Sequence, residues 1–462
     1  MNRSILPVAT AAGLVLGLLG ASLLPVQQPA VDGSPNDDRA RVAVACPTIV
    51  GAADPTAIAA GSPQGALATA PLEQPDNRTL VTGTLAVTPR SSGPVLVTAP
   101  RLDAFSGTSR SAATEGSARG LSMMSCDRPT ASQWFAGVRS SNTATAEVVL
   151  LNADAQDATV DLTVYGAEGR VTAPGSRGII VPALSRRVVP LGPLFNADQP
   201  VSLHVSTSAG RVAAAVRQRL SVADQAAGSD WLHPTADPAT SVAIPGLPAG
   251  KGARDLVVVN PGDRTASVAL QVLGANGQTA VPGFETLDLP PGTSRVIPLG
   301  NALAEAPVGL RLVSEQKVTA AVLSDNGAAA GGVDFATQIA TTALTRPGVL
   351  ALAPGGRVSP VLHLTNGGAD PVTARVSVTD AAATSLLDVT VTVPGLADTT
   401  VALPRAENVL IGVQPGAPGA LYASVAVRAA LEGVTGVASL AVLPGAAAAT
   451  LPPIRHDPRV GS

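Results

Sequence analysis

Side chains that could act as nucleophiles, general bases or metal ligands are few and scattered along this sequence. The four histidines are His204, His233, His363 and His456, and none belongs to an HExxH motif. The chain also lacks a GxSxG elbow, a P-loop and a dinucleotide-binding fingerprint. No spacing suggests the paired carboxylates of a glycosidase. We therefore expect a protein that is not an enzyme and has no cofactor, metal site or catalytic residue.

Three aromatic positions have spacings that could serve binding. Trp231 follows Asp230 and Phe335 follows Asp334, each at the end of a repeated segment, and Trp134 precedes the first such segment. An exposed ring could stack on a sugar, but aromatics make up only 2% of the chain. We expect these rings to pack at domain joints. The alternative is that they form a sugar-binding platform.

The two cysteines, Cys46 and Cys126, lie 80 positions apart (126 − 46), and neither belongs to a CxxC motif. Two cysteines without histidine partners cannot make a tetrahedral zinc site. In an oxidising compartment we expect them to form one disulfide, and the alternative is two unrelated buried thiols.

The amino terminus reads as an export segment. Arg3 precedes an uncharged, largely apolar stretch over 5–26, long enough to span the hydrocarbon of a bilayer. The positive end orients the chain with its start in the cytoplasm and the remainder outside. The sequence Gln27-Gln28-Pro29-Ala30 makes a poor cleavage site, which favours an uncleaved anchor over a signal peptide.

The chain repeats itself. Residues 152–192 align without a gap on residues 260–300, a shift of 108 positions (260 − 152), and a fainter third copy follows. Within the copies apolar residues alternate with polar ones, as in Val160-x-Leu162-x-Val164, which is typical of β-strands. Several short strands in a repeat of domain size predict an all-β protein of tandem immunoglobulin-like β-sandwiches. We expect these sandwiches to form a rod.

An asparagine recurs at the end of one strand in each copy: Asn152, Asn260 and Asn366. Asparagine side chains bond to nearby backbone, so we expect each to close a turn. The oxygen-rich run over 152–157 could instead hold calcium, but the second copy lacks both acids at the matching positions.

The predicted organisation has seven parts. They are a signal peptide or membrane anchor helix (1–30), a linker (31–41), an N-terminal β region with the disulfide (42–128), three β-sandwich repeats (129–237, 238–344 and 345–446) and a disordered tail (447–462). The Ser/Thr/Gly-rich stretch over 105–120 is expected to be a mobile loop.

The sequence resembles one known family. An export segment, Cys46-Pro47, a second cysteine before Trp134-Phe135, and the strand end over 256–260 followed by Pro261 are similar to the DUF5719 family. The resemblance implies an uncharacterised, exported actinobacterial envelope protein. That family has no assigned activity, so no functional residue is carried over.

These observations favour a non-catalytic cell-envelope protein, a multi-domain scaffold or interaction module. Its expected partner is an envelope protein or a cell-wall glycan, and it would contact the membrane through its N-terminal segment. It would be anchored facing outward or secreted to the envelope. With a net charge of −3 and few aromatics, we expect no nucleic-acid binding. The alternative function is carbohydrate binding or processing.

Overall fold

The computed structural model describes antiparallel β-sheet within one compact unit. The described residues are 42–48, 56–63, 67–81, 83–99, 105–222, 225–300, 303, 306–328, 332–353 and 358–445. In these ranges the regular elements are strands, apart from short 3-10 segments such as η2 (Gly116–Ala118), so the predicted all-β class is confirmed. No helix within them has the length and hydropathy to span a bilayer. The predicted segments 1–30, 31–41 and 447–462 lie outside the described residues.

The strands fall into four successive repeats. The first contains β1 (Val42–Cys46), β2 (Thr56–Gly61), β3 (Ala68–Pro71), β4 (Thr79–Leu80), β5 (Leu85–Ser91), β6 (Val95–Ala99), β7 (Ser106–Ala113) and β8 (Gly120–Ser125). The second contains β9 (Ser132–Ser140), β10 (Ala144–Asn152), β11 (Ala158–Gly166), β12 (Gly169–Val171), β13 (Ile179–Val181), β14 (Ser185–Pro190), β15 (Ala197–Ala209), β16 (Ala213–Val222) and β17 (Gln225–Leu232).

The other two repeats follow the same order. The third contains β18 (Ala239–Leu247), β19 (Arg254–Asn260), β20 (Ala266–Gly274), β21 (Gly277–Ala280), β22 (Thr286–Leu289), β23 (Thr293–Pro298), β24 (Val308–Asp325) and β25 (Phe335–Ile339). The fourth contains β26 (Gly348–Leu352), β27 (Val358–Asn366), β28 (Val372–Thr379), β29 (Ser385–Val393), β30 (Ala397–Ala402), β31 (Val409–Pro415), β32 (Leu421–Leu431) and β33 (Val434–Ala441).

Each repeat is built from two packed layers with one shared topology. In the second repeat, layer A has the strand order β12-β11-β15-β9 and layer B has the order β14-β10-β16-β17. The first and fourth repeats follow the same plan, with β1 and β26 in layer A and β8 and β33 in layer B. In the third repeat the long β24 belongs to both layers, which joins them into one sheet of 8 strands. The first repeat is therefore one more copy of the repeated unit, which the alignment of the sequence with itself did not detect.

The alternating sequence pattern places small apolar side chains between the two layers. Val160, Leu162 and Val164 on β11 are all buried in the core of the second repeat, as their spacing predicted. Fully burying a side chain of this kind contributes roughly 1.5–3 kcal/mol. Valine, leucine and alanine fill most of these cores. Several of the few aromatic rings can therefore pack at the joints between repeats.

The recurring asparagine closes a turn in three repeats, as predicted. The Asn260 amide nitrogen donates to the carbonyl oxygens of Arg264 at 2.7 Å, Leu289 at 3.0 Å and Pro290 at 3.2 Å, while its Oδ1 accepts the N–H of Gly262 at 3.0 Å. The equivalent bonds recur at Asn152 and at Asn366. Each asparagine thus binds the start of one strand connection to the end of another.

Consecutive repeats pack face to face through their layers. Between the first and second repeats, Leu96 and Val149 belong to one cluster of buried side chains together with Trp231. Between the second and third, Ala136 packs with Val257 and with side chains of β24 and β25. Between the third and fourth, the Ser424 hydroxyl on β32 donates to the carbonyl oxygen of Pro245 on β18 at 3.0 Å.

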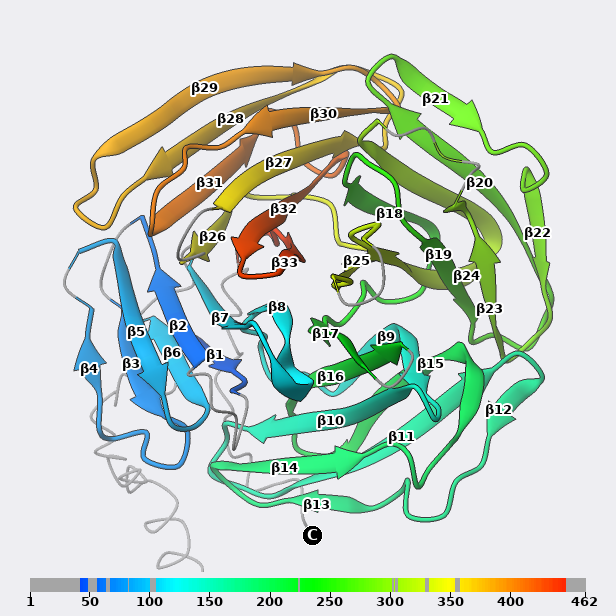
Figure 1. The fold of residues 1–462 in the computed structure, drawn as a ribbon, viewed down its shortest axis with the longest axis horizontal. Helices are drawn as coiled ribbons and strands as arrows, with labels where there is room; N and C mark the ends of the chain where they lie inside the picture. Colours follow the sequence, from blue (N-terminus) through cyan, green and yellow to red (C-terminus); the bar gives the residue numbers. More distant parts are fainter. Residues whose placement is uncertain are drawn as a thin grey trace, which may run out of the picture. The chain divides into compact units, whose positions relative to one another are not determined.

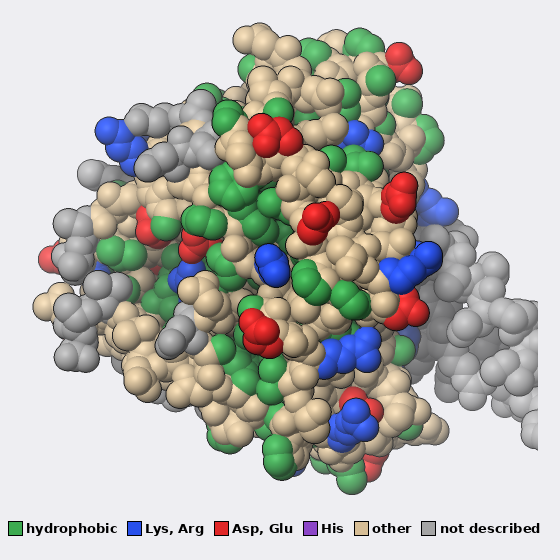
Figure 2. Space-filling model, turned by 90° about the vertical axis from the view of Figure 1, so that its right-hand side faces the viewer, with side chains coloured by type: hydrophobic (Ala, Val, Ile, Leu, Met, Phe, Trp, Pro, Cys, Tyr) green, Lys and Arg blue, Asp and Glu red, His purple; other side chains and the backbone are tan. Residues whose placement is uncertain are grey.

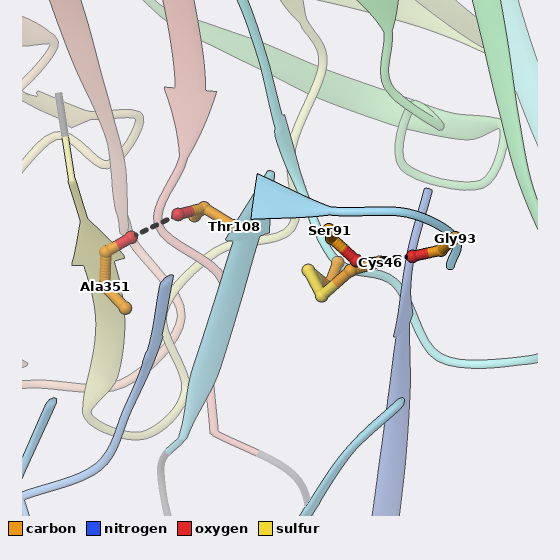
Figure 3. Close-up of a disulfide and its surroundings, with 6 residues drawn as sticks. Cys46, Ser91, Gly93, Thr108 and Ala351 are labelled. Carbon is orange, nitrogen blue, oxygen red and sulfur yellow. Dashed lines mark hydrogen bonds between the residues drawn. A yellow bond between two sulfur atoms is a disulfide. The ribbon is translucent and has the colours of Figure 1, made fainter. Parts of the chain in front are cut away.

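The fourth repeat also packs against the first, which closes the four repeats into a ring (Figure 1). A cluster at this joint combines Ala59 and Leu85 of the first repeat with Val349 and Leu410 of the fourth. In addition, the Thr108 hydroxyl on β7 donates to the carbonyl oxygen of Ala351 on β26 at 2.7 Å (Figure 3). The expectation of a rod is therefore wrong, because the first and fourth repeats also meet, through apolar side chains of both.

The expectation of a mobile loop over 105–120 is also wrong. Most of this stretch forms β7, in which 6 of the 8 positions are buried. Its serine, threonine and glycine residues are small because the neighbouring chain is close. A Cβ added at Gly107 would lie 2.8 Å from the Cys126 Sγ and 3.1 Å from the Cys46 Sγ. The composition that suggested mobility instead provides room for close packing.

Candidate functional site

The last strand of each repeat lies at the centre of the ring. These strands are β8, β17, β25 and β33, and each contacts two of the others (Figure 1). A glycine recurs near the start of each of them, at Gly120, Gly228, Gly332 and Gly436, with spacings of 108, 104 and 104 positions (228 − 120, 332 − 228 and 436 − 332). This recurrence is the sequence signal that could have revealed the fourth copy.

The carboxylate of Asp334 occupies the space that two of these glycines, Gly120 and Gly228, leave. A side chain at Gly120 or Gly228 would collide with it. Asp334 is fully buried, and its Oδ2 accepts the backbone N–H of Leu121 at 3.0 Å and of Val437 at 2.8 Å. One side chain of the third repeat therefore binds the backbone of the first and fourth repeats.

Asp230 plays the matching part in the second repeat. Its buried carboxylate accepts the backbone N–H groups of Trp231, Met123 and Thr337, the last two belonging to the first and third repeats. Asp230 and Asp334 together join all four repeats, and we call them the acid hub.

Burial dominates the ionisation of the acid hub. It raises the pKa of Asp334 to about 7, although the N–H groups of Leu121 and Val437 act in the opposite direction. Burial raises the pKa of Asp230 well above its ordinary value, and the charge of Asp334 raises it further. At neutral pH the hub therefore holds protons that exposed aspartates would have released.

A large open cavity lies at the end of the ring where the central strands begin. It has a volume of about 940 Å³ and is lined by the chain before β8 and by the hairpin turns of the second and fourth repeats. Arg119 lines it and donates to the carbonyl oxygens of Ala226 at 2.9 Å and Gly433 at 3.4 Å. Glu115 and Glu432 also line it. We call it the hairpin cavity.

A second cavity lies at the opposite end of the central strands. It has a volume of about 470 Å³ and is lined by the segments that leave β8, β17, β25 and β33, so all four repeats contribute to it. Cys126, Asp127 and Arg128 line it from the first repeat. We call it the linker cavity.

The predicted disulfide is present beside the linker cavity. Cys46 on β1 and Cys126 after β8 are bonded, with their Cα atoms 4.3 Å apart (Figure 3). The bond joins layer A to layer B of the first repeat. The backbone N–H of Ala45 also donates to the carbonyl oxygen of Asp127 at 2.8 Å, which fixes the start of the linker to β1.

The three predicted aromatic residues are all buried at joints between repeats. Trp231 is 1% exposed, Phe335 2% and Trp134 7%. Trp134 stacks on His204 with ring centroids 4.1 Å apart, and together with Tyr165 it packs against Val259 of the third repeat. None of these three rings presents an open face for stacking on a sugar.

Two buried histidines make contacts that the sequence did not predict. Burial lowers the pKa of His233 to about 4, so its ring is neutral, and its Nε2 lies 3.3 Å from the Met123 carbonyl oxygen. His363 Nδ1 lies 3.1 Å from Asp398 Oδ2, and Ser424 is its partner on the adjacent strand. This serine, histidine and aspartate resemble a catalytic set, but each is at most 2% exposed and the serine hydroxyl bonds to Pro245.

Charged groups form no concentrated site among the described residues. No group of three or more histidine, cysteine or acidic side chains within the described ranges could hold a metal ion. The face shown in Figure 2 carries acidic and basic side chains interspersed, and neither sign gathers into a patch.

Comparison with known proteins gave a family match and a similar solved structure. The family described as "Family of unknown function (DUF5719)" matches residues 84–406. A solved structure titled "Crystal Structure of Thermotoga maritima 1070" is 18% identical, with 22% of this chain and 93% of that chain covered and a TM-score of 0.20. No curated protein matches the chain.

Proposed function

Since the chain belongs to the DUF5719 family, a family of unknown function, we propose that it is a non-catalytic exported protein of the cell envelope. In this proposal it is a multi-domain scaffold or interaction module whose partner is another envelope component. The proposal includes an actinobacterial source, an uncleaved or cleaved N-terminal export helix, and immunoglobulin-like character for each repeat.

The observation that carries the proposal is the use of the acid hub. Asp230 and Asp334 are buried acids at the centre of the molecule whose pKa values are raised by burial, and a perturbed carboxyl group in such a place would suggest catalysis. Both instead accept backbone N–H groups from neighbouring repeats. Their chemistry is used to hold the ring together, which is what a rigid scaffold requires.

The location outside the cell is supported by the disulfide and by the N-terminal sequence. Disulfides persist in oxidising compartments, and the bond between Cys46 and Cys126 joins two layers of the first repeat. Arg3 followed by the apolar stretch over 5–26 would direct the chain across the membrane.

The alternative, carbohydrate binding through aromatic platforms, is weakened by burial of Trp134, Trp231 and Phe335. A ring at most 7% exposed cannot stack on a sugar unless the joint opens.

The proposal is tested by tagging the full chain in its own cells and crosslinking it in place. We expect external protease to reach the tagged protein in intact cells, peptide mapping to recover Cys46 linked to Cys126, and one envelope component to be enriched. A chain carrying Trp231→Ala, which loosens a joint, should lose that enrichment, whereas Leu80→Ala at an exposed site should keep it. Free thiols, a cytoplasmic location, or turnover of an envelope glycan that one carboxylate substitution abolishes would contradict the proposal.

A further inference from the structure

The outermost strand of the fourth repeat is an open sheet edge. β29 ends the strand order β26-β31-β28-β29, and among the described strands it pairs only with β28. It runs along the outer rim of the ring (Figure 1). On its free side the backbone N–H and C=O groups therefore have no neighbouring strand in the part of the chain that the structure describes, which leaves them available to another chain.

The corresponding edges of the other three repeats are short or interrupted. The second repeat divides this edge into β12 and β13, of 3 residues each, with Pro174 between them. The third divides it into β21 and β22, of 4 residues each, with Pro282 between them, and the first has only β4, of 2 residues. Short strands and prolines protect sheet edges from pairing with another chain. β29 has 9 residues without proline, lysine or arginine, so it lacks this protection.

The apolar side chains of β29 that face the core are incompletely covered. Leu387, Val389 and Val391 pack against the core of the fourth repeat, but all three are only partly buried. In the second repeat Ile179 and Val181 on β13 are 9% and 0% exposed. A strand added beside β29 would cover the exposed parts of its three apolar side chains and would bond to its free backbone groups.

The sequence of β29 fits a second copy of itself. Antiparallel pairing about a twofold axis at Val389 pairs all 9 residues, because Ser385 then lies opposite Val393 of the second copy. Residues that face the core pair with residues that face the core, since Leu387 lies opposite Val391 of the second copy. Apolar pairs of this kind stabilise neighbouring strands.

The charge on β29 favours the same register. Asp388 is its one ionisable residue, and Arg375 on β28 donates to it from Nε at 2.8 Å and from Nη2 at 2.6 Å. With the axis at Val389, Asp388 of each copy lies opposite Thr390 of the other, so no like charges meet. An axis at Asp388 would place two carboxylates opposite each other, which is destabilising, and would pair fewer residues.

We propose that β29 pairs with β29 of a second copy of this chain, in antiparallel register about Val389. The pairing joins layer A of the fourth repeat in two rings into one continuous sheet. An edge of 9 residues is smaller than the interface of a permanent dimer, so the dimer is reversible, with a Kd in the micromolar range, and dilution yields single rings. This inference does not rest on the scaffold function, since a scaffold can act as one ring or as two.

The register is tested by Val389→Cys in the full chain. Both native cysteines are bonded to each other, so the new thiol can form a disulfide with the same thiol of a second copy. Opposite residues of an antiparallel pair have Cα atoms about 4.5–5.5 Å apart, which suits a disulfide. The matched control is Ser385→Cys, exposed on the same strand but about 26 Å from its own equivalent in this register. Mild oxidation should give linked dimers of Val389→Cys, and few of Ser385→Cys, on a non-reducing gel.

The association is measured by light scattering of the full chain in detergent micelles, at about 1–200 μM protein. Thr390→Asp, at an exposed site, places a second carboxylate opposite Asp388 twice in the dimer, and should raise the Kd about tenfold or more. Thr390→Lys places an ammonium group there instead and should leave the Kd unchanged or lower it. The matched control is Thr286→Asp, at an exposed threonine of the edge strand β22, which should leave the Kd unchanged.

Three results would overturn the inference. They are a wild-type chain that stays monomeric over the whole concentration range, equal amounts of linked dimer from Val389→Cys and Ser385→Cys, and equal Kd values for Thr390→Asp and Thr286→Asp. A monomeric chain that binds an extended segment of another protein along β29 would likewise exclude a second copy as the occupant. Each of these results leaves the scaffold proposal untouched, because that proposal is tested by location and crosslinking.

Discussion

At the scale of single residues, an asparagine side chain makes the same set of hydrogen bonds to the backbone in three repeats. Asn152, Asn260 and Asn366 each bind three carbonyl oxygens and one N–H group. Each side-chain amide thus supplies hydrogen-bond partners to four backbone groups, which find no such partners within the irregular connections. Aspartate could not do this, because an ionised carboxylate has no donor.

Replacing Asn260 by alanine should therefore destabilise the protein strongly. The buried carbonyl oxygen of Leu289 would lose a donor, and we expect the free energy of unfolding to fall by about 2–3 kcal/mol. Urea unfolding followed by circular dichroism measures this change. Asn77→Ala is the control, because Asn77 is exposed and its amide bonds to the exposed Gln74 side chain. Equal unfolding midpoints for the two variants would contradict the role of the asparagine.

The acid hub makes stability depend on pH in a defined direction. Unfolded aspartate titrates near pH 3.9, whereas burial raises the pKa of Asp334 to about 7 in the folded chain. Between these values the folded state holds a proton that the unfolded chain has released. Raising the pH from 4 to 7 should therefore lower the free energy of unfolding, by up to about 1.4 kcal/mol per pH unit for this group.

Asp334→Asn should flatten this dependence between pH 5 and pH 7, measured by urea unfolding at each pH. The asparagine oxygen can still accept the N–H groups of Leu121 and Val437. His233, whose pKa is lowered to about 4, has the opposite effect on stability, but it is common to both proteins and cancels. Asp388→Asn is the control, because Arg375 lowers the pKa of that exposed carboxyl below the window. A slope unchanged by Asp334→Asn would exclude Asp334 as a source of the pH dependence.

At the scale of elements, the repeats are joined by rings and small side chains on the outer faces of their layers. Trp231 projects from β17 into the joint with the first repeat, where it belongs to the same cluster as Ala45 and Leu96. Phe335 on β25 lies beside Gly228 of β17. Large rings near the central axis fill spaces that alanine and valine leave.

Trp231→Ala should lower the free energy of unfolding by about 3–5 kcal/mol, because it removes a fully buried ring from a joint. Phe335→Ala should act in the same direction. Differential scanning calorimetry measures both, with Leu80→Ala, at a side chain 76% exposed, expected to change little. An unchanged melting curve together with lost binding to a cell-wall polysaccharide would make Trp231 a recognition platform.

At the scale of the whole molecule, closure of the ring is the decisive feature. The joint between the first and fourth repeats brings Thr108 within hydrogen-bond distance of Ala351, 243 positions away in sequence. Closure also aligns the segments that line the linker cavity, so the candidate site exists only in the closed arrangement.

A chain spanning residues 42–445 should therefore be compact in solution. For a globular chain of this length we expect a radius of gyration of about 22 Å, whereas four domains of this size in a line would give about 39 Å. Small-angle X-ray scattering distinguishes the two values. A radius near the larger value would contradict closure of the ring.

The sequence alone was sufficient for the local features. Alternation at Val160, Leu162 and Val164 predicted a strand, the repeated asparagine predicted a turn, and Cys46 and Cys126 predicted a disulfide. These features depend on neighbouring residues or on a single pair of cysteines. The same local reasoning failed over 105–120, because small polar residues suit both a mobile loop and a closely packed strand, and only the neighbouring Sγ atoms distinguish the two.

Only the tertiary structure decided how the repeats meet. Asp334 reads in the sequence as an acid before an aromatic residue, and its role depends on Leu121 and Val437, which lie 213 and 103 positions away. Alternation shows which face of a strand is apolar, but not which of several apolar faces will pack against it. The rod and the ring use the same strands, and they differ in whether the first and last repeats touch. That contact arises only when all four curved, two-layered repeats are assembled, because packing between layers is non-directional and its partner is set by geometry.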